Sequence, residues 1–211
     1  MLKYKLVIFD FDGTLADSFA TFLEVWEVAA GRHGFRAASQ CDLQRLRGCG
    51  AREIIAEAGV PWWKLPLVAR HMQELMRERI AGVGLFDGIE TVLRTLKAEG
   101  VQVAIVTSNS RANVELVLGA GRLGLIDHFG CGASLFGKRP KTRAVIKAAG
   151  VSPADVLCVG DEIRDAEAAD ELGLDFAAVS WGYTYPERLE GLPGVRMCRS
   201  ADELLSLVIA G

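Results

Sequence analysis

The sequence lacks the features of several large protein classes. No apolar run approaches the roughly 20 residues that a membrane-spanning helix needs, and Asp10 follows the first apolar run too soon for a signal peptide. Basic residues are not in excess, since 24 Lys and Arg stand against 27 Asp and Glu, whereas nucleic-acid-binding proteins are usually basic. We therefore expect a cytoplasmic protein with no membrane or nucleic-acid partner.

Cysteine is also scarce. There are five cysteines, an odd number, and no Cys-x-x-Cys pair, so their spacing suits neither a disulfide framework nor a zinc site. We expect reduced thiols that pack as small apolar side chains, as in cytoplasmic proteins.

What the sequence does contain is an alternation of two hydrophobic patterns. Half of its 211 residues are hydrophobic, enough for a substantial core. Short, nearly continuous apolar runs are typical of parallel strands buried on both faces, and they occur at 6–9, 101–106, 156–159 and 176–179, with a weaker run at 131–136. Helical stripes separate these runs, as at Ile89, Val92, Leu93 and Leu96. The alternation predicts an α/β fold with a Rossmann-like, doubly wound and mostly parallel sheet.

One segment, residues 16–86, interrupts this alternation. It contains no convincing strand, and its apolar residues recur at helical spacing. Its net charge is +1, against −4 for the rest of the chain. We therefore expect residues 16–86 to form a helical cap domain inserted into a core domain of residues 1–15 and 87–211, with Trp62 and Trp63 packed within the cap.

Acidic side chains follow the first apolar run directly. Asp10 and Asp12 lie two residues apart, and the next residue, Gly13, permits a backbone conformation that other residues resist. Two carboxylates at the end of a buried strand repel each other. A cation or a charged substrate usually offsets this repulsion. For Asp12 and Gly13 alone, an ordinary acidic turn is the alternative explanation.

A polar motif, Thr107-Ser108-Asn109, follows the run at 101–106 in the same way. Side chains and backbone amides at such a position can hold a phosphate oxygen. Helix capping is the more common explanation of such a motif when it occurs alone.

Two more carboxylates, Asp161 and Asp165, follow the run at 156–159, where they also suit the dipole of a helix N-terminus. Lys138 precedes them in a basic loop of the kind that is usually a solvated surface turn. In open α/β sheets, however, ligands bind where several strands end at their carboxyl edge. Carboxylates, a hydroxyl group and a lysine at one such edge are the groups that magnesium-assisted phosphoryl transfer needs.

On these motifs the sequence resembles the haloacid dehalogenase superfamily. The four family motifs correspond, in family order, to Asp10-x-Asp12-Gly13-Thr14, Thr107, Lys138 and Gly160-Asp161-x-x-x-Asp165. The helical segment corresponds to the small cap of the family. The stretches 85–89 and 180–183 are most similar to phosphoglycolate phosphatase-like members. Because the lysine motif is loose, Lys141 is an alternative to Lys138.

The resemblance implies a Mg²⁺-dependent phosphatase that hydrolyses a small metabolite of the phosphoglycolate type through an aspartyl-phosphate. Asp10 would be the nucleophile, and Asp12 would be the general acid and then the general base. Mg²⁺ would bind Asp10, the backbone carbonyl of Asp12 and Asp161, with Glu162 as a further candidate ligand.

The resemblance also implies roles for the residues around these carboxylates. Thr107, Ser108 and Lys138 would bind the oxygens of the transferring phosphate. Gly13 and Asn109 would support the site. Asp165 would orient Lys138 or hold a water molecule on the metal.

Arg47 and Arg52 flank a glycine-containing stretch of the helical segment. Relatives place a substrate-reading loop here, so we predict that Arg52, then Arg47, anchors an anionic group of the substrate. A surface turn is the alternative.

Two other functions stay open. Asp12 favours phosphate esters over dehalogenation, but sugar-phosphate mutases of the β-phosphoglucomutase type also keep an acid there and share the helical cap. The other alternative is a non-catalytic module that binds phosphorylated metabolites. The expected partner in each case is a small phosphorylated metabolite, and the expected oligomeric state is a monomer or a homodimer.

Overall fold

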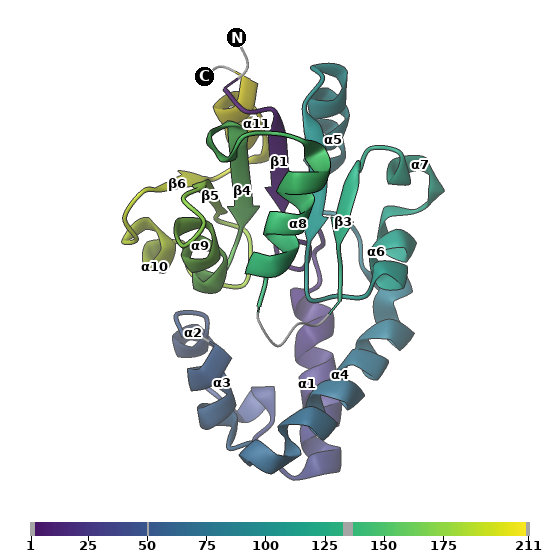
Figure 1. Ribbon diagram of the computed structural model, residues 1–211. Helices are drawn as coiled ribbons and strands as arrows, with labels where there is room; N and C mark the ends of the chain where they lie inside the picture. The colour runs from purple at the N-terminus through teal and green to yellow at the C-terminus, as the bar shows by residue number, and fades with distance from the viewer. Residues whose placement is uncertain (1–2, 50, 133–136, 210–211) are drawn as a thin grey trace.

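A computed structural model describes residues 3–49, 51–132 and 137–209. Figure 1 shows two groups of elements: a sheet with helices on both sides, and a group of helices beyond the arrowheads of the strands. The carboxyl ends of the strands therefore face the second group.

The sheet has six parallel strands in the order β3-β2-β1-β4-β5-β6. They are β1 (Leu6–Phe9), β2 (Gln102–Val106), β3 (His128–Gly130), β4 (Val156–Gly160), β5 (Asp175–Val179) and β6 (Val195–Cys198). From β1 the chain adds β2 and β3 on one side, and it then returns to the other side of β1 through β4. This reversal confirms the predicted doubly wound sheet and places the topological switch point, where ligands bind in such folds, at the carboxyl end of β1.

Four of the predicted strands are present as β1, β2, β4 and β5, each within a residue or two of its apolar run. The weaker run at 131–136 does not begin a strand, because β3 ends at Gly130; residues 133–136 lie outside the described residues. The sequence also does not predict β6. This edge strand is only partly buried, and its residues, Val195-Arg196-Met197-Cys198, form no continuous apolar run.

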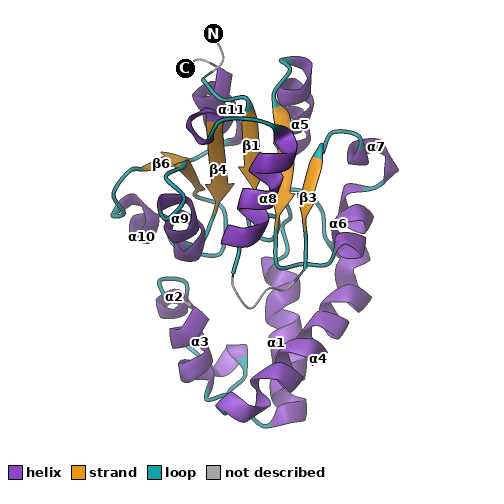
Figure 2. Ribbon diagram, viewed as in Figure 1, coloured by secondary structure: helices purple, strands orange, loops and turns teal. Residues whose placement is uncertain are grey.

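Helices cover both faces of the sheet (Figure 2). On one face pack α5 (Ile89–Ala98), α6 (Arg111–Leu118), α7 (Ala120–Leu123) and α11 (Ala201–Ile209). On the other face pack α8 (Arg139–Ala149), α9 (Ile163–Asp170) and α10 (Pro186–Glu190). Side chains of β1 alternate between the two faces: Val7 and Phe9 join the first core, and Leu6 and Ile8 join the second. Because both faces are buried, every residue of β1 is apolar.

Four helices form the second group, and we call them the cap helices. They are α1 (Phe19–His33), α2 (Leu43–Leu46), α3 (Ala51–Ala58) and α4 (Leu65–Arg79). Helix α1 packs against α4 through Val25, Ala29 and Leu75, and against α2 and α3 through Trp26 and Ala30. Among the described residues, no helix has the length and apolar character required to cross a membrane.

The prediction for Trp62 and Trp63 is wrong. The two residues are 77% and 65% exposed, and their rings contact each other with centroids 5.9 Å apart. They lie in a 3₁₀ turn (Trp62–Lys64) that precedes α4. The core between α1 and α4 is filled by other apolar side chains, which leaves both indoles at the surface.

The chain crosses between the sheet and the cap helices twice, at neighbouring positions. Phe86 N donates a hydrogen bond to the carbonyl of Leu15 (2.9 Å), and Asp17 N donates to the carbonyl of Gly84 (2.9 Å). The first crossing directly follows the first acidic loop, and the second is hydrogen-bonded to the first. The position of the cap helices is therefore connected to that loop through the backbone.

Candidate active site

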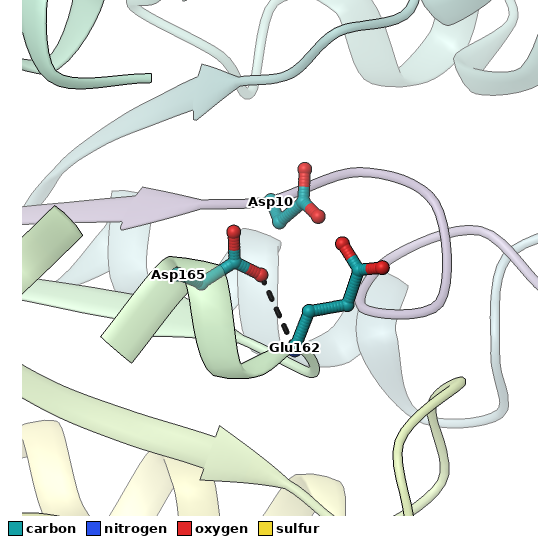
Figure 3. A group of neighbouring side chains, drawn as sticks. All are labelled: Asp10, Glu162 and Asp165. Atoms are coloured by element: carbon teal, nitrogen blue, oxygen red, sulfur yellow. Dashed lines mark hydrogen bonds between the residues drawn. The ribbon is translucent and has the colours of Figure 1, made fainter. Parts of the chain in front are cut away.

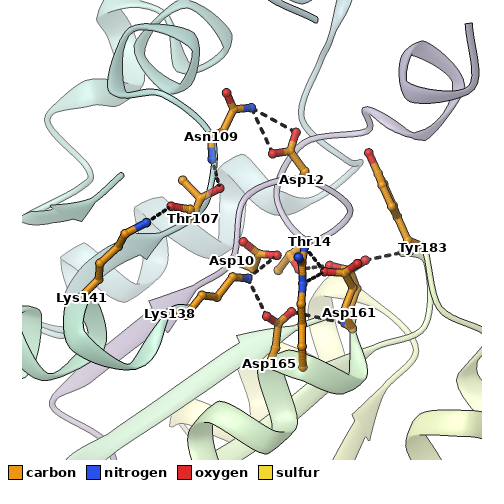
Figure 4. A network of polar contacts seen from close by, with 12 residues as sticks. Asp10, Asp12, Thr14, Thr107, Asn109, Lys138, Lys141, Asp161, Asp165 and Tyr183 are labelled. Carbon is orange, nitrogen blue, oxygen red and sulfur yellow. Dashed lines mark hydrogen bonds and ion pairs between the residues drawn. The ribbon is translucent and has the colours of Figure 1, made fainter. Parts of the chain in front are cut away.

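Three of the predicted motifs meet at the carboxyl ends of neighbouring strands. Asp10 follows β1, Thr107 follows β2, and Asp161 follows β4, and β1 lies between the other two strands. Figure 4 shows these side chains together with Lys138, which directly precedes α8. The sheet thus brings together residues that lie far apart in the sequence.

Lys138 lies between two buried carboxylates. Its Nζ is 2.7 Å from Asp10 Oδ2 and 2.6 Å from Asp165 Oδ1, and the three side chains are only 14%, 6% and 6% exposed. Burial works against the ammonium form, but the two carboxylates raise the pKa of Lys138 above its ordinary value. Lys138 is therefore a buried cation held against Asp10.

The other candidate lysine, Lys141, has a different environment. Its Nζ donates to the backbone carbonyls of Thr107 (2.8 Å) and Gly132. These contacts join the loops that follow β2 and β3. The structure thus places Lys138, rather than Lys141, beside Asp10.

Asp161 is enclosed by hydrogen-bond donors and glycines. Thr14 Oγ1 donates to its Oδ1 (2.7 Å), and Tyr183 N donates to its Oδ2 (2.8 Å). A Cβ atom on Gly13, whose φ is +79°, would lie 2.3 Å from Asp161 Oδ2. A Cβ atom on Gly182 would lie 2.1 Å from Asp161 Cβ. The two glycines are thus required by the close approach of the backbone to a fully buried carboxylate.

Carboxylate oxygens cluster at this edge of the sheet. One oxygen from each of Asp10, Glu162 and Asp165 lies within 4.8 Å of the others (Figure 3). Burial raises the pKa values of Asp10 and Glu162; Lys138 and Arg164 oppose this effect, and neighbouring carboxylates add to it. Burial likewise raises the pKa of Asp161 well above its usual range.

These residues fit a divalent cation. Lys138 contacts Asp10 and Asp165, and Arg164 pairs with Glu162, so two cations face four carboxylates when Asp161 is included. Oxygen donors with an excess of negative charge are what Mg²⁺ prefers in proteins. The predicted ligand group of Asp10, Asp161 and the carbonyl of Asp12 shares only Asp10 with the oxygen cluster of Figure 3.

Asp12 points away from this cluster. In Figure 4 its carboxylate is turned toward Asn109, whose Nδ2 donates to Oδ2 (3.0 Å). Ser18 Oγ donates to Oδ1 (3.0 Å), and the Tyr183 hydroxyl lies 2.8 Å from Ser18 Oγ. Burial raises the pKa of Asp12, and the hydrogen bonds from Ser18 and Asn109 oppose this effect.

The motif after β2 is not a helix cap. Helix α6 is capped by Ser110, whose Oγ accepts a hydrogen bond from Asn113 N (3.1 Å). Thr107 is buried, and its Oγ1 accepts a hydrogen bond from Asn109 N (3.0 Å). Ser108 is exposed in the same loop.

The two predicted anchors in the cap helices differ in their surroundings. The Arg47 guanidinium donates to the carbonyls of Tyr183 (2.9 Å) and Gly182 (2.8 Å) and lies over the ring of Tyr185. Arg52 is exposed in the first turn of α3. Arg47 therefore joins α2 to the loop after β5, and the role of both arginines as substrate anchors stays a prediction. Gly50, between them, lies outside the described residues.

The sequence analysis did not identify the hydroxyl groups around Asp12, the predicted acid, and Asp161, the predicted metal ligand. Thr14 stands in the first motif, but its position there does not reveal that it donates to Asp161. Ser18 directly precedes α1 and has the pattern of an N-cap, yet its side chain caps nothing and contacts Asp12 instead. The sequence indicated Tyr183 only as part of the stretch 180–183, which is similar to relatives.

Comparisons with known proteins find relatives over almost the whole chain. A sequence model of the family described as haloacid dehalogenase-like hydrolase matches residues 7–179. A phosphoglycolate phosphatase of Synechococcus elongatus is 33% identical over 207 residues, 97% of each chain. An N-acetylmuramic acid 6-phosphate phosphatase of Pseudomonas aeruginosa is 28% identical, over 88% of this chain and 86% of that protein. A solved haloacid dehalogenase-like family hydrolase of Streptococcus pneumoniae has the same fold, with a TM-score of 0.81 and 18% identity over 97% of this chain and 98% of that one.

The enclosure of Asp161 yields a stability prediction. Gly182→Ala places a methyl group where Asp161 already lies, so we expect the free energy of unfolding to fall by about 1–3 kcal/mol. Gly191→Ala is the matched control, because the nearest atom to its Cβ would be 3.7 Å away, and it should change the free energy by less than about 0.5 kcal/mol. Urea denaturation measures both. Equal effects of the two substitutions would contradict the close contact.

Proposed function

Because the chain belongs to the haloacid dehalogenase-like hydrolases, we propose that it is a Mg²⁺-dependent phosphatase that works through an aspartyl-phosphate on Asp10. The observation that carries the proposal is the buried contact between Asp10 and Lys138, 2.7 Å long, at the switch point of the sheet. A carboxylate in that position can act as a nucleophile while the lysine attracts a phosphate dianion. Its substrates are phosphomonoesters of small metabolites.

In the first step an oxygen of Asp10 attacks phosphorus, and the bond from phosphorus to the leaving oxygen breaks. Lys138 holds Oδ2 of Asp10, while Oδ1 receives no hydrogen bond from the residues that the structure describes, which leaves Oδ1 free to attack. Asp12 gives its proton to the leaving oxygen, so an alcohol departs rather than an alkoxide.

In the second step water attacks the phosphorus atom of the aspartyl-phosphate. Asp12, now a carboxylate, takes a proton from that water, and the bond between phosphorus and Asp10 breaks. Inorganic phosphate is released, and both aspartates return to their starting states. In both steps Lys138 would offset the negative charge on the phosphoryl oxygens. The hydroxyl groups of Thr107 and Ser108 would donate hydrogen bonds to the same oxygens.

We assign the metal to Asp10, Asp161 and the carbonyl of Asp12, with Glu162 as a further candidate. A bound Mg²⁺ would offset the negative charge of these carboxylates and of the phosphoryl group. Thr14 and Tyr183 hold the Asp161 carboxylate in one orientation, which would keep its oxygens in place for the ion.

The substrate is a phosphomonoester that also carries a carboxylate. The two phosphatases to which the chain is similar are named for phosphoglycolate and for N-acetylmuramic acid 6-phosphate, and both compounds contain a carboxylate besides the phosphate. An arginine suits such a group because its guanidinium can form two parallel hydrogen bonds. We place phosphoglycolate first, with Arg52 as the anchor of its carboxylate.

Asp10→Asn tests the chemistry. We expect release of inorganic phosphate from phosphoglycolate to fall by at least about a thousandfold, because the amide is a poor nucleophile. Asp202→Asn makes the same chemical change at an exposed position on α11 and should retain activity. Turnover by Asp10→Asn at a rate close to that of the unaltered protein would show that Asp10 is not the nucleophile. Formation of an isomerised sugar phosphate by the unaltered protein, without free phosphate, would point to a mutase, and no turnover of any phosphorylated metabolite would point to a binding module.

Metal binding is tested without turnover. Mg²⁺ at about a hundred times its dissociation constant should add about 2.7 kcal/mol to the free energy of unfolding, because it binds only the folded carboxylates. Asp161→Asn should weaken this increment, whereas Asp202→Asn should leave it intact. If Asp161→Asn keeps the full increment and Glu162→Gln loses it, the ligand assignment moves to the cluster of Figure 3.

Arg52→Ala tests the substrate. We expect KM for phosphoglycolate to rise by about tenfold with little change in kcat, because the lost contact serves ground state and transition state alike. The KM for p-nitrophenyl phosphate, which has no carboxylate, should stay the same. Arg70→Ala, an exposed arginine on α4, is the control. Unchanged kinetics with phosphoglycolate would remove Arg52 from the substrate site.

A further inference from the structure

The hydroxyl groups of Tyr183 and Ser18 form a series of hydrogen bonds that ends at the Asp12 carboxylate. Neither group has a role in the two steps described above. Ser18 Oγ lies 3.0 Å from Asp12 Oδ1 and 2.8 Å from the Tyr183 hydroxyl. We propose that Tyr183 is a positioning residue: through Ser18 its hydroxyl group holds Asp12 in the orientation from which Asp12 protonates the leaving alcohol. This inference rests on the proposed function, in which Asp12 is that acid.

The direction of these two hydrogen bonds follows from the number of hydrogens on each hydroxyl group. A hydroxyl group has a single hydrogen to donate. Since Ser18 Oγ donates it to Asp12, Ser18 can only accept from the Tyr183 hydroxyl. Tyr183 thus donates to Ser18, and Ser18 donates to Asp12.

Asn109 also contacts the Asp12 carboxylate. Its Nδ2 lies 3.0 Å from Asp12 Oδ2 and 3.3 Å from Oδ1. The amide cannot turn over, because its Oδ1 already accepts hydrogen bonds from Ser110 N (2.8 Å) and Asn113 Nδ2 (2.9 Å). Asn109 and Ser18 together hold both oxygens of the carboxylate. Without the Ser18 contact, Oδ1 keeps only the longer contact with Asn109, and the orientation of the carboxylate is less firmly fixed.

Tyr183 is itself held by the cap helices. Its ring lies edge-on against Phe19, with centroids 5.0 Å apart, and tilted against Phe22 at 5.7 Å. Its carbonyl accepts a hydrogen bond from Arg47 (2.9 Å). The position of the Tyr183 hydroxyl therefore depends on α1 and α2. Its hydrogen bonds through Ser18 connect the cap helices to Asp12.

The arrangement stabilises the product of proton donation. When the bond from phosphorus to the leaving oxygen breaks, its electron pair stays on that oxygen, which takes the proton from Asp12. Negative charge then develops on Asp12, where Ser18 and Asn109 already donate hydrogen bonds. Donors that are in place before the reaction lower the barrier more than groups that must reorient during it.

The test compares two leaving groups. Phosphoglycolate expels an alkoxide that needs a proton, whereas p-nitrophenyl phosphate expels a stable phenolate that does not. The readout is kcat/KM, because it covers the steps up to release of the alcohol and excludes the later hydrolysis of the aspartyl-phosphate. Tyr183→Phe keeps the ring and removes the hydroxyl group. We expect kcat/KM to fall by about tenfold for phosphoglycolate and by less than about twofold for p-nitrophenyl phosphate.

Two further substitutions complete the comparison. Tyr185→Phe removes a hydroxyl group from the same loop that makes no hydrogen bond within the described part of the chain, and both values of kcat/KM should stay unchanged. Ser18→Ala removes the intermediate hydroxyl group and should reproduce the selective loss. Adding Tyr183→Phe to Ser18→Ala should cause no further loss, because the chain is already interrupted.

Equal losses on the two substrates, or no loss on either, would overturn the assignment of Tyr183. Asp12→Asn, measured beside it, separates this failure from failure of the proposed function. If Asp12→Asn shows the selective loss and Tyr183→Phe does not, the acid role of Asp12 stands and the Tyr183 assignment is wrong. If Asp12→Asn lowers both values equally, the acid role is wrong, and the Tyr183 assignment falls with it.

Discussion

A buried ammonium group between two carboxylates is the interaction on which the rest of the site depends. Lys138 contacts Asp10 and Asp165 where the strands end, in surroundings where an unpaired charge would cost several kcal/mol. One lysine does not balance the carboxylates that this edge of the sheet collects. The surrounding structure supplies further donors, among them Thr14 and the backbone of Tyr183 on Asp161. The negative charge that remains would attract a divalent cation, and the bound cation would in turn attract a phosphate group.

The loop after β5 joins this acidic site to the cap helices. Tyr183 donates from its backbone to Asp161 and packs its ring on α1, while Arg47 holds the carbonyls of Gly182 and Tyr183. The same loop therefore touches a proposed metal ligand, the hydroxyl chain to Asp12 and the helices that would select the substrate. Movement of the cap helices would reach the reacting groups through this loop as well as through the two backbone crossings.

Much of this arrangement could be predicted from the sequence, because strands buried on both faces read as continuous apolar runs. Asp10, Thr107 and Asp161 follow such runs, and a parallel sheet must bring the carboxyl ends of its strands together. The hydroxyl groups could not be predicted, since Ser18 has the same pattern whether it caps a helix or contacts a carboxylate. The same limit applies to Arg47. The sequence pattern of an arginine beside glycines is the same whether the arginine binds a substrate or donates hydrogen bonds to a neighbouring loop.

The central claim is that Asp10 carries the phosphoryl group between the substrate and water. The most direct measurement is rapid acid quenching of the protein during turnover of a substrate with radiolabelled phosphate, followed by mapping of the labelled peptide. We expect a transient label on the peptide that contains Asp10, and hydroxylamine should release it as it does from an acyl-phosphate. A label on another residue, or turnover with no labelled protein at any time, would show that Asp10 does not carry the phosphoryl group.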